Sequence, residues 1–194
     1  MILDLLKKRC SIRSFKEQEI ETEKVDRILE AGRLSPSGGN EQPWIFGVIR
    51  EKGLIEEISG IAYKQGWIAT SSLLFVLCTT IIEDKRGARE IQKRRFPKRR
   101  DEIDKMDKVL YSYLNSEEHQ TKIAGTHMAL QALELGIYST WVSYFEAEKL
   151  AELLNFPKLI VPSEILVFGY PEEEPMPRLK KELKEIVFYN HYAP

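Results

Sequence analysis

The chain has 194 residues, of which 43% are hydrophobic and 30% charged, a balance typical of one globular domain with a real core. Its formal net charge of -1 excludes a global pull toward nucleic acid or membrane surfaces. The longest apolar run, residues 73–82, is too short to cross a bilayer as a helix. The N-terminus carries its charges after its apolar residues, the reverse of a secretory signal, so we expect a cytoplasmic protein.

The first half of the chain predicts helices and strands in alternation. A short amphipathic helix at 2–8 precedes a second helix that Thr22 is suited to cap and that gives way to a loop at 34–40. The apolar face of this second helix carries, at helical spacing, Val25, Ile28, Leu29 and Gly32. Three further elements follow: a strand at 44–49, a helix at 54–70 and a strand at 71–82. Because the last strand is apolar throughout, we place it at the centre of the sheet.

The second half begins with a strongly charged segment, residues 84–119, which we expect to be helical in two pieces broken near Pro97. Residues 121–135 are apolar on most faces and form the most core-like helix, with Gly136 as its C-cap. The remaining predicted elements are a strand at 138–142, a helix at 146–154, a strand at 164–169 and a possible edge strand at 184–189. This mixture predicts one α+β domain over residues 1–194, with a mostly antiparallel sheet flanked by helices.

An arginine-rich cluster follows the first helix. Arg9 and Arg13 are four residues apart, and Ser11 lies between them. Two guanidinium forks and a hydroxyl so close together can grip the oxygens of a phosphate. On these residues alone a solvated turn explains the cluster as well, because basic residues are common at helix C-termini.

A second polar cluster occupies residues 35–44, Ser-Pro-Ser-Gly-Gly-Asn-Glu-Gln-Pro-Trp. Its glycines allow a ligand to approach the backbone closely. Ser37, Asn40 and Gln42 offer the donors and acceptors that a heterocycle with imide edges requires. A surface loop leading into a strand is the alternative interpretation.

Together, these two clusters resemble the N-terminal signature of the FMN-dependent nitroreductase family. The resemblance continues in residues 136–145 and 169–180, and it is weakest at residues 84–119. It implies a nitroreductase-like fold, completed by homodimerisation, with FMN at the subunit interface. It also implies a ping-pong reaction that passes hydride from NADH or NADPH to a nitroaromatic, a quinone or a similar small aromatic acceptor. The apolar helix at 121–135 is the expected core of the dimer.

The resemblance assigns the phosphate end of the cofactor to both ends of the chain. Arg9, Ser11 and Arg13 match residues that hold the phosphate, the ribityl chain and the pyrimidine edge of FMN. Arg178 and Lys180 match a C-terminal basic pair that completes the phosphate site. Without the resemblance, these last two residues would be interpreted as an exposed basic pair.

The resemblance also assigns contacts around the flavin ring. Three positions match residues that reach the ring from the other subunit: Pro36, Ser37 and Asn40. Ser143 and Tyr144, which stand where some members have Glu-Gly, match the pair beside the reactive central nitrogen. Gln65 lies near a position that often touches the flavin. Cys10 stands where the family often has Arg or His, so we expect it to contact FMN through its backbone.

Residues 85–100 contain nine basic residues and one acidic residue, Glu90. Three interpretations compete: a solvated helical face, a lid over the flavin that attracts the phosphates of NADPH, and a polyanion-binding patch. Family members often cover the flavin with a variable insertion at this point. We therefore favour the lid or the solvated face for residues 84–119 and expect no nucleic-acid partner.

No other catalytic pattern stands out in the sequence. The three histidines lack the spacing of metal ligands, so we expect no metal site. Because hydride chemistry belongs to the flavin, we assign no catalytic side chain. Two alternatives remain: a flavoprotein of the same fold with another redox role, such as dehydrogenation, dehalogenation or flavin breakdown, and a non-enzymatic polyanion-binding module.

Overall fold

The computed structural model describes residues 1–63, 65–80, 88–114 and 117–191. Its centre is an antiparallel sheet with the strand order β1-β2-β4-β3. The strands are β1 (Trp44–Ile49), β2 (Leu73–Thr80), β3 (Tyr138–Val142) and β4 (Ile160–Gly169). The predicted α+β class with a mostly antiparallel sheet is confirmed.

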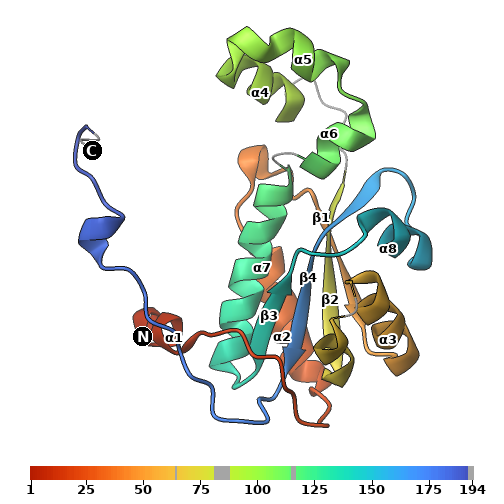
Figure 1. The fold of residues 1–194 in the computed structure, drawn as a ribbon, viewed down its shortest axis with the longest axis vertical. Helices are drawn as coiled ribbons and strands as arrows, with labels where there is room; N and C mark the ends of the chain where they lie inside the picture. Colours follow the sequence, from red (N-terminus) through yellow and green to blue (C-terminus); the bar gives the residue numbers. More distant parts are fainter. Residues whose placement is uncertain (64, 81–87, 115–116, 192–194) are drawn as a thin grey trace.

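Helices cover both faces of this sheet (Figure 1). One face carries α2 (Thr22–Arg33) and α7 (Glu117–Glu134), and the other carries α3 (Lys52–Ile61) and α8 (Ala147–Leu153). The N-terminal helix α1 (Ile2–Lys8) buries none of its residues. The described helices include none that is long and apolar enough to cross a membrane.

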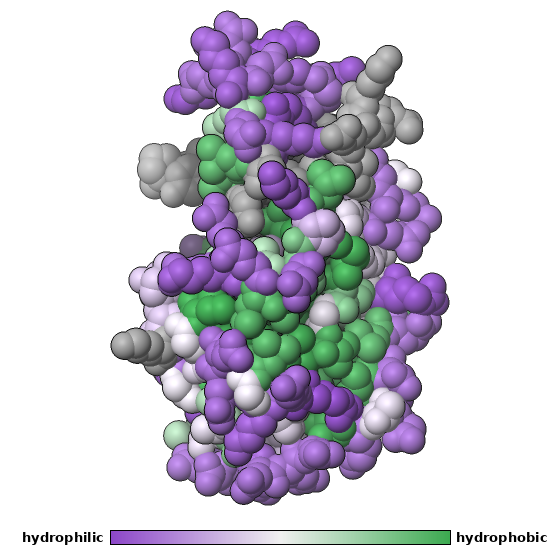
Figure 2. Space-filling model, turned by 90° about the vertical axis from the view of Figure 1, so that its right-hand side faces the viewer, coloured by the Kyte–Doolittle hydropathy of each residue, from purple (hydrophilic) through white to green (hydrophobic). Residues whose placement is uncertain are grey.

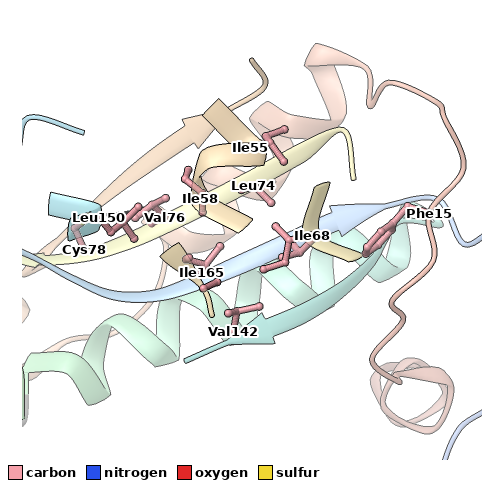
Figure 3. Packing of buried hydrophobic residues seen from close by; sticks show 12 residues of the cluster. Phe15, Ile55, Ile58, Ile68, Leu74, Val76, Cys78, Val142, Leu150 and Ile165 are labelled. Atoms are coloured by element: carbon pink, nitrogen blue, oxygen red, sulfur yellow. Dashed lines mark hydrogen bonds between the residues drawn. The ribbon is translucent and has the colours of Figure 1, made fainter. Parts of the chain in front are cut away.

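The central strand β2 is buried on both sides, as its continuous apolar sequence predicts. Leu74, Val76 and Cys78 point into a core with α3 and α8, which Figure 3 shows from close by. The alternate residues of β2, Leu73 and Phe75 among them, point into a second core with α2 and α7. This alternation follows from the period of two along a strand. Burial also raises the pKa of the Cys78 thiol to about 12, which marks it as an inert core residue.

Helix α7 approaches its neighbours closely because two of its contacts involve glycine. A Cβ on Gly125 would lie 2.5 Å from Leu77 Cδ1 and 2.5 Å from Trp141 Cη2. A Cβ on Gly32 of α2 would lie 2.1 Å from Met128 Cε. The outer face of α7 is exposed, with Ile123 40% accessible. A single chain therefore does not bury α7 on most faces, although the mostly apolar sequence of this helix is typical of a buried one.

The segment after β4 pairs with the N-terminal segment. The Lys16 amide donates to the Tyr170 carbonyl at 2.9 Å, and the Glu172 amide donates to the Ser14 carbonyl at 3.3 Å. Phe15 lies against Gly169, where an added Cβ would be 2.4 Å from Phe15 Cδ1. This antiparallel pairing brings the arginine-rich cluster next to the segment that leads to the C-terminus.

The charged segment forms a separate group of short helices at one end of the molecule (Figure 1). They are α4 (Ala88–Arg95), η3 (Pro97–Arg99), α5 (Arg100–Lys105) and α6 (Lys108–Leu114). The break near Pro97 is confirmed, but the segment has more than the two predicted pieces; its residues 84–87 and 115–116 lie outside the described residues. Hydrophilic residues dominate this end, whereas hydrophobic residues gather on the body beneath it (Figure 2).

Several predicted elements differ from the structure. The helix at 54–70 is wrong as one element: α3 ends at Ile61, Tyr63 has a φ of +52°, and residues 66–70 form the 3-10 helix η2 (Gly66–Thr70). The N-cap of α2 is Glu21, not Thr22, which is already helical. Strand β4 begins earlier than residue 164, and β2 begins at Leu73 rather than residue 71.

The predicted edge strand at 184–189 is also wrong. Among the described residues of the tail, 173–191, a short 3-10 helix, η4 (Leu183–Glu185), is the one regular element, and residues 176–191 are all exposed. This described part of the tail runs away from the sheet (Figure 1). A strand needs a neighbouring edge for its hydrogen bonds, and residues 184–189 have none among the described strands.

Candidate functional site

A cavity of about 250 Å³ lies where the two ends of the chain meet. Its lining residues are Arg9, Cys10, Ser11, Arg13, Met176, Arg178 and Lys180. All of them except Met176 were predicted to bind the cofactor. The pairing of residues 14–16 with residues 170–172 explains the convergence, because it sets the two flanking segments side by side.

The described lining of this cavity contains four basic side chains and no acidic one. Among the described residues, no carboxylate forms an ion pair with Arg9, Arg13, Arg178 or Lys180. The guanidinium of Arg13 instead lies over the ring of Trp67, 5.6 Å from its centroid. Four cations around a small cavity attract an anion of high charge density.

A second group of predicted residues lies around the end of β3. The Gln65 side chain donates from Nε2 to the Tyr144 carbonyl at 3.1 Å and to the Ala62 carbonyl at 3.0 Å. The ring of Tyr144 stacks on that of Tyr63, with the centroids 4.0 Å apart and the planes inclined by 21°. Both tyrosines are exposed, so the stacked pair offers a flat aromatic surface to solvent.

A buried carboxylate supports this second group. Ser143 Oγ donates to Glu164 Oε2 at 2.6 Å, and Lys122 Nζ lies 2.9 Å from Glu164 Oε1. Glu164 is only 1% exposed. Glu164 was not among the predicted site residues, although a single acidic residue opening the apolar stretch 164–169 was a visible signal.

The third predicted group lies apart from the other two. Pro36, Ser37 and Asn40 belong to the loop between α2 and β1, where Ser37 Oγ accepts from the Gln42 amide at 2.9 Å. The loop is tied to α7, because the Gly38 amide donates to Gln120 Oε1 at 2.6 Å. Within the described part of the chain, no hydrogen bond or ion pair joins these three residues to the cavity or to Ser143.

A larger cavity, of about 670 Å³, contains none of the predicted residues. It lies between residues 15–19, 50–55 and 69–72. Its charged lining residues have both signs: Lys16, Arg50 and Lys52 against Glu17 and Glu19. The smaller cavity, with cations alone, is therefore the stronger candidate for an anionic ligand. No group of potential metal ligands occurs among the described residues.

The fold and this site define an α+β protein with a cavity lined by cations from two distant segments of the chain. The Nitroreductase family model matches residues 6–109, which is more than half of the 194 residues, so the chain belongs to the nitroreductase family. A solved structure of a nitroreductase family protein from Clostridium difficile 630 is 28% identical and covers 99% of each chain, with a TM-score of 0.75.

Three relatives carry names that bear on function. An Archaeoglobus fulgidus protein whose name pairs NADH dehydrogenase with NAD(P)H nitroreductase is 28% identical over 176 residues, covering 89% of this chain and 86% of its own length. The FMN reductase (NAD(P)H) of Bacillus subtilis is 25% identical over 174 residues, covering 89% and 67%. The iodotyrosine deiodinase of Thermotoga neapolitana is 24% identical over 198 residues, covering 99% of both.

Proposed function

We propose that this protein is an FMN-dependent oxidoreductase that transfers hydride from NADH or NADPH to a nitroaromatic, a quinone or a similar flat acceptor. The family membership and the relatives named for NAD(P)H, FMN and nitroreductase activity support the general reaction. The observation that carries the proposal for the site is the cavity in which four cations from both chain ends converge, with no carboxylate partner among the described residues.

The cavity fits the phosphate of FMN. Arg9, Arg13, Arg178 and Lys180 can bind the phosphate oxygens, and the Ser11 hydroxyl adds a further donor. Cys10 contributes through its backbone. Sites that enclose a whole ligand measure roughly 300–1,000 Å³, so a cavity of about 250 Å³ holds one end of the cofactor only.

The rest of the cofactor would extend toward the second group of residues. Arg13 lies between the two regions, because its guanidinium lies over Trp67, two residues from Gln65. In this arrangement Gln65, Ser143 and Tyr144 would orient the flavin ring.

When bound, FMN supplies the hydride chemistry, taking hydride from the reduced nicotinamide and giving it to the acceptor. The stacked rings of Tyr63 and Tyr144 provide a wall against which flat molecules pack. Because nicotinamide and acceptor use the same open face, one must leave before the other binds. This shared position gives ping-pong turnover.

We also propose that the functional unit is a homodimer. The tail exposes a run of large apolar side chains: Leu183, Ile186, Val187 and Phe188, which are 75%, 60%, 43% and 59% accessible. A second copy covers this surface and the outer face of α7. It also brings the loop with Pro36, Ser37 and Asn40 to the flavin of its partner.

Residues 84–119 complete the proposal as a variable insertion within the single domain of residues 1–194. Its described helices, α4 to α6, stand at one end of the subunit and carry a hydrophilic surface (Figure 2). A lid in this place draws the phosphates of NADPH toward the flavin by charge.

The visible spectrum of the purified protein tests the function directly. We expect a yellow protein whose flavin bleaches when NADH or NADPH is added without oxygen and regains its colour when a quinone or nitroaromatic follows. A colourless protein that does not take up added FMN contradicts the proposal. Light scattering should give twice the chain mass of 22.6 kDa, and a monomer that retains FMN contradicts the dimer.

Reductive dehalogenation is the second candidate, favoured by the relative named iodotyrosine deiodinase, which matches over 99% of both chains. The exposed pair of Tyr63 and Tyr144 suits a halogenated phenol as well as a quinone. Release of halide from a halophenol by the chemically reduced protein, together with no bleaching by reduced nicotinamide, favours this alternative.

A further inference from the structure

The carboxylate of Glu164 is an unusual feature of the core, because the proposed reaction gives it no task. It is 1% exposed at a position of β4 that a run of buried apolar residues follows. Burying a charge is costly unless it is paired and hydrogen-bonded. Glu164 satisfies this condition through the ammonium of Lys122 on one oxygen and the hydroxyl of Ser143 on the other.

The chemistry of these three groups fixes the direction of each hydrogen bond. A carboxylate only accepts and an ammonium only donates, whereas a hydroxyl does both. Ser143 must therefore give its single proton to Glu164, 2.6 Å away. What remains on the exposed side of Ser143 Oγ is a pair of acceptor sites and no donor.

We infer that Glu164 is a positioning residue that makes Ser143 an acceptor-only group and so favours reduced over oxidised FMN. This inference rests on the proposed function, which sets Ser143 beside the reactive nitrogen of the flavin. That nitrogen accepts hydrogen bonds in the oxidised ring and carries a hydrogen after hydride uptake. Only the reduced cofactor can therefore donate to Ser143, and the oxidised cofactor faces lone pairs.

Lys122 makes the inference testable with a small change. In Glu164→Gln the amide oxygen must face Lys122, because an amide nitrogen cannot accept from an ammonium. The amide nitrogen then faces Ser143 and donates to its oxygen. The Ser143 hydroxyl then points its proton toward the flavin, where it can donate to the nitrogen of the oxidised ring. The preference for reduced over oxidised FMN therefore reverses.

The experiment measures the affinity of the apoprotein for oxidised FMN and, without oxygen, for reduced FMN, and it measures the midpoint potential of the bound flavin. In Glu164→Gln we expect the ratio of reduced to oxidised affinity to fall about fivefold, the effect of one hydrogen bond, and the potential to become more negative. Ser143→Ala, a change at an exposed position, should lower the same ratio. In the Ser143→Ala background, Glu164→Gln should have no further effect on it.

A matched control is Glu146→Gln. Glu146 also pairs with a lysine, since its Oε1 lies 2.9 Å from Lys149 Nζ, and it lies three residues after Ser143. This variant removes one negative charge from the same neighbourhood without touching the Ser143 hydroxyl, and we expect an unchanged ratio.

Two results would overturn the inference. The first is an unchanged ratio of reduced to oxidised FMN affinity in Ser143→Ala. This measurement can be made even if the Glu164→Gln variant does not fold. The second is an effect of Glu164→Gln that is equally large with and without the Ser143 hydroxyl, because that result indicates a long-range charge effect. A wild-type protein that does not bind FMN overturns the proposed function instead, so the two failures are distinct.

Discussion

The protein has two basic clusters that differ in how their charge is balanced. In the α4–α5 cluster, residues 88–105, two basic side chains form ion pairs: Lys93 pairs with Glu90 and Asp104, and Arg99 pairs with Glu102. In the cavity cluster, formed by residues 9–13 and 178–180, no described carboxylate pairs with any of the four cations. The α4–α5 cluster is denser in the sequence, yet the cavity cluster is the better anion site.

The difference follows from sequence distance. Glu90 and Glu102 stand three residues from the cations with which they pair, a spacing that makes side chains neighbours on a helix, and Asp104 is 11 residues from Lys93. The cavity cluster gathers cations that are more than 160 residues apart, and the segments that bring them together carry no acid into the cavity. The density of basic residues along the sequence is therefore a poorer guide to an anion site than the convergence of basic side chains in the folded chain.

Removing the arginines of the cavity should have the largest effect. Each charge-assisted hydrogen bond contributes about 1.5–3 kcal/mol, so Arg9→Ala with Arg13→Ala should weaken FMN binding by roughly 100-fold or more. Titration of the apoprotein with FMN measures this. The matched control, Lys98→Ala with Arg100→Ala in the α4–α5 cluster, should leave the affinity unchanged. Unchanged FMN occupancy in the first variant would refute the phosphate assignment.

Disturbing the pairing of the chain ends should come next. In Gly169→Ala the new Cβ meets the Phe15 ring at 2.4 Å, and overpacking of this kind costs about 1–3 kcal/mol. Denaturant unfolding should show that loss, and FMN affinity should fall with it because the two basic segments lose their register. Gly60→Ala in α3, where no atom lies within 4 Å of the new Cβ, should be neutral or stabilising by about 0.5–1 kcal/mol. Equal free energies of unfolding for Gly169→Ala and Gly60→Ala would contradict this prediction.

Acid should weaken FMN binding through the ligand. A phosphate monoester gains its second charge with a pKa of about 6. FMN affinity should therefore decline as the pH falls through about 6, and riboflavin, which lacks the phosphate, should bind weakly without this dependence. Parallel pH profiles for the two ligands would exclude the phosphate as the group held in the cavity.

The smallest effect is expected in the α4–α5 cluster. The hydrogen bond from Lys93 lowers the pKa of the Asp104 carboxyl. The contribution of this pair is therefore complete above the unfolded carboxyl pKa of about 3.9 and is lost as the pH falls below it. Asp104→Asn should remove it at every pH, seen as faster hydrogen exchange in α4 and α5 with unchanged FMN affinity. A loss of FMN affinity in this variant would mean that the two clusters are coupled.

Local patterns predicted much of the fold. The strands at 44–49 and 138–142 were predicted to the residue, because short β-prone runs bounded by turn residues leave little choice of limits. The helix at 54–70 failed for a tertiary reason. The Gln65 side chain donates to both the Ala62 and the Tyr144 carbonyls. Tyr63, which has a φ of +52°, stacks on Tyr144. The end of the helix near residue 61 therefore depends on contacts with Tyr144, some 80 positions away.

The site shows the same division between local and distant information. The arginine-rich cluster, with the family resemblance, led to the residues that line the cavity, although their role as FMN ligands stays a prediction. Trp67, Tyr63 and Glu164 were missed, because an aromatic or acidic side chain acquires its role from a partner that the sequence does not place beside it. The tail strand failed since apolar spacing alone does not supply a neighbouring edge.

The use of two distant segments at one cavity has a consequence for truncation. The cavity combines residues 9–13 with residues 178–180, which belong to a segment with no buried side chain. Loss of residues 173–191 removes no buried side chain, yet it deletes two of the four cations, so a clipped chain would retain its architecture while losing its hold on FMN.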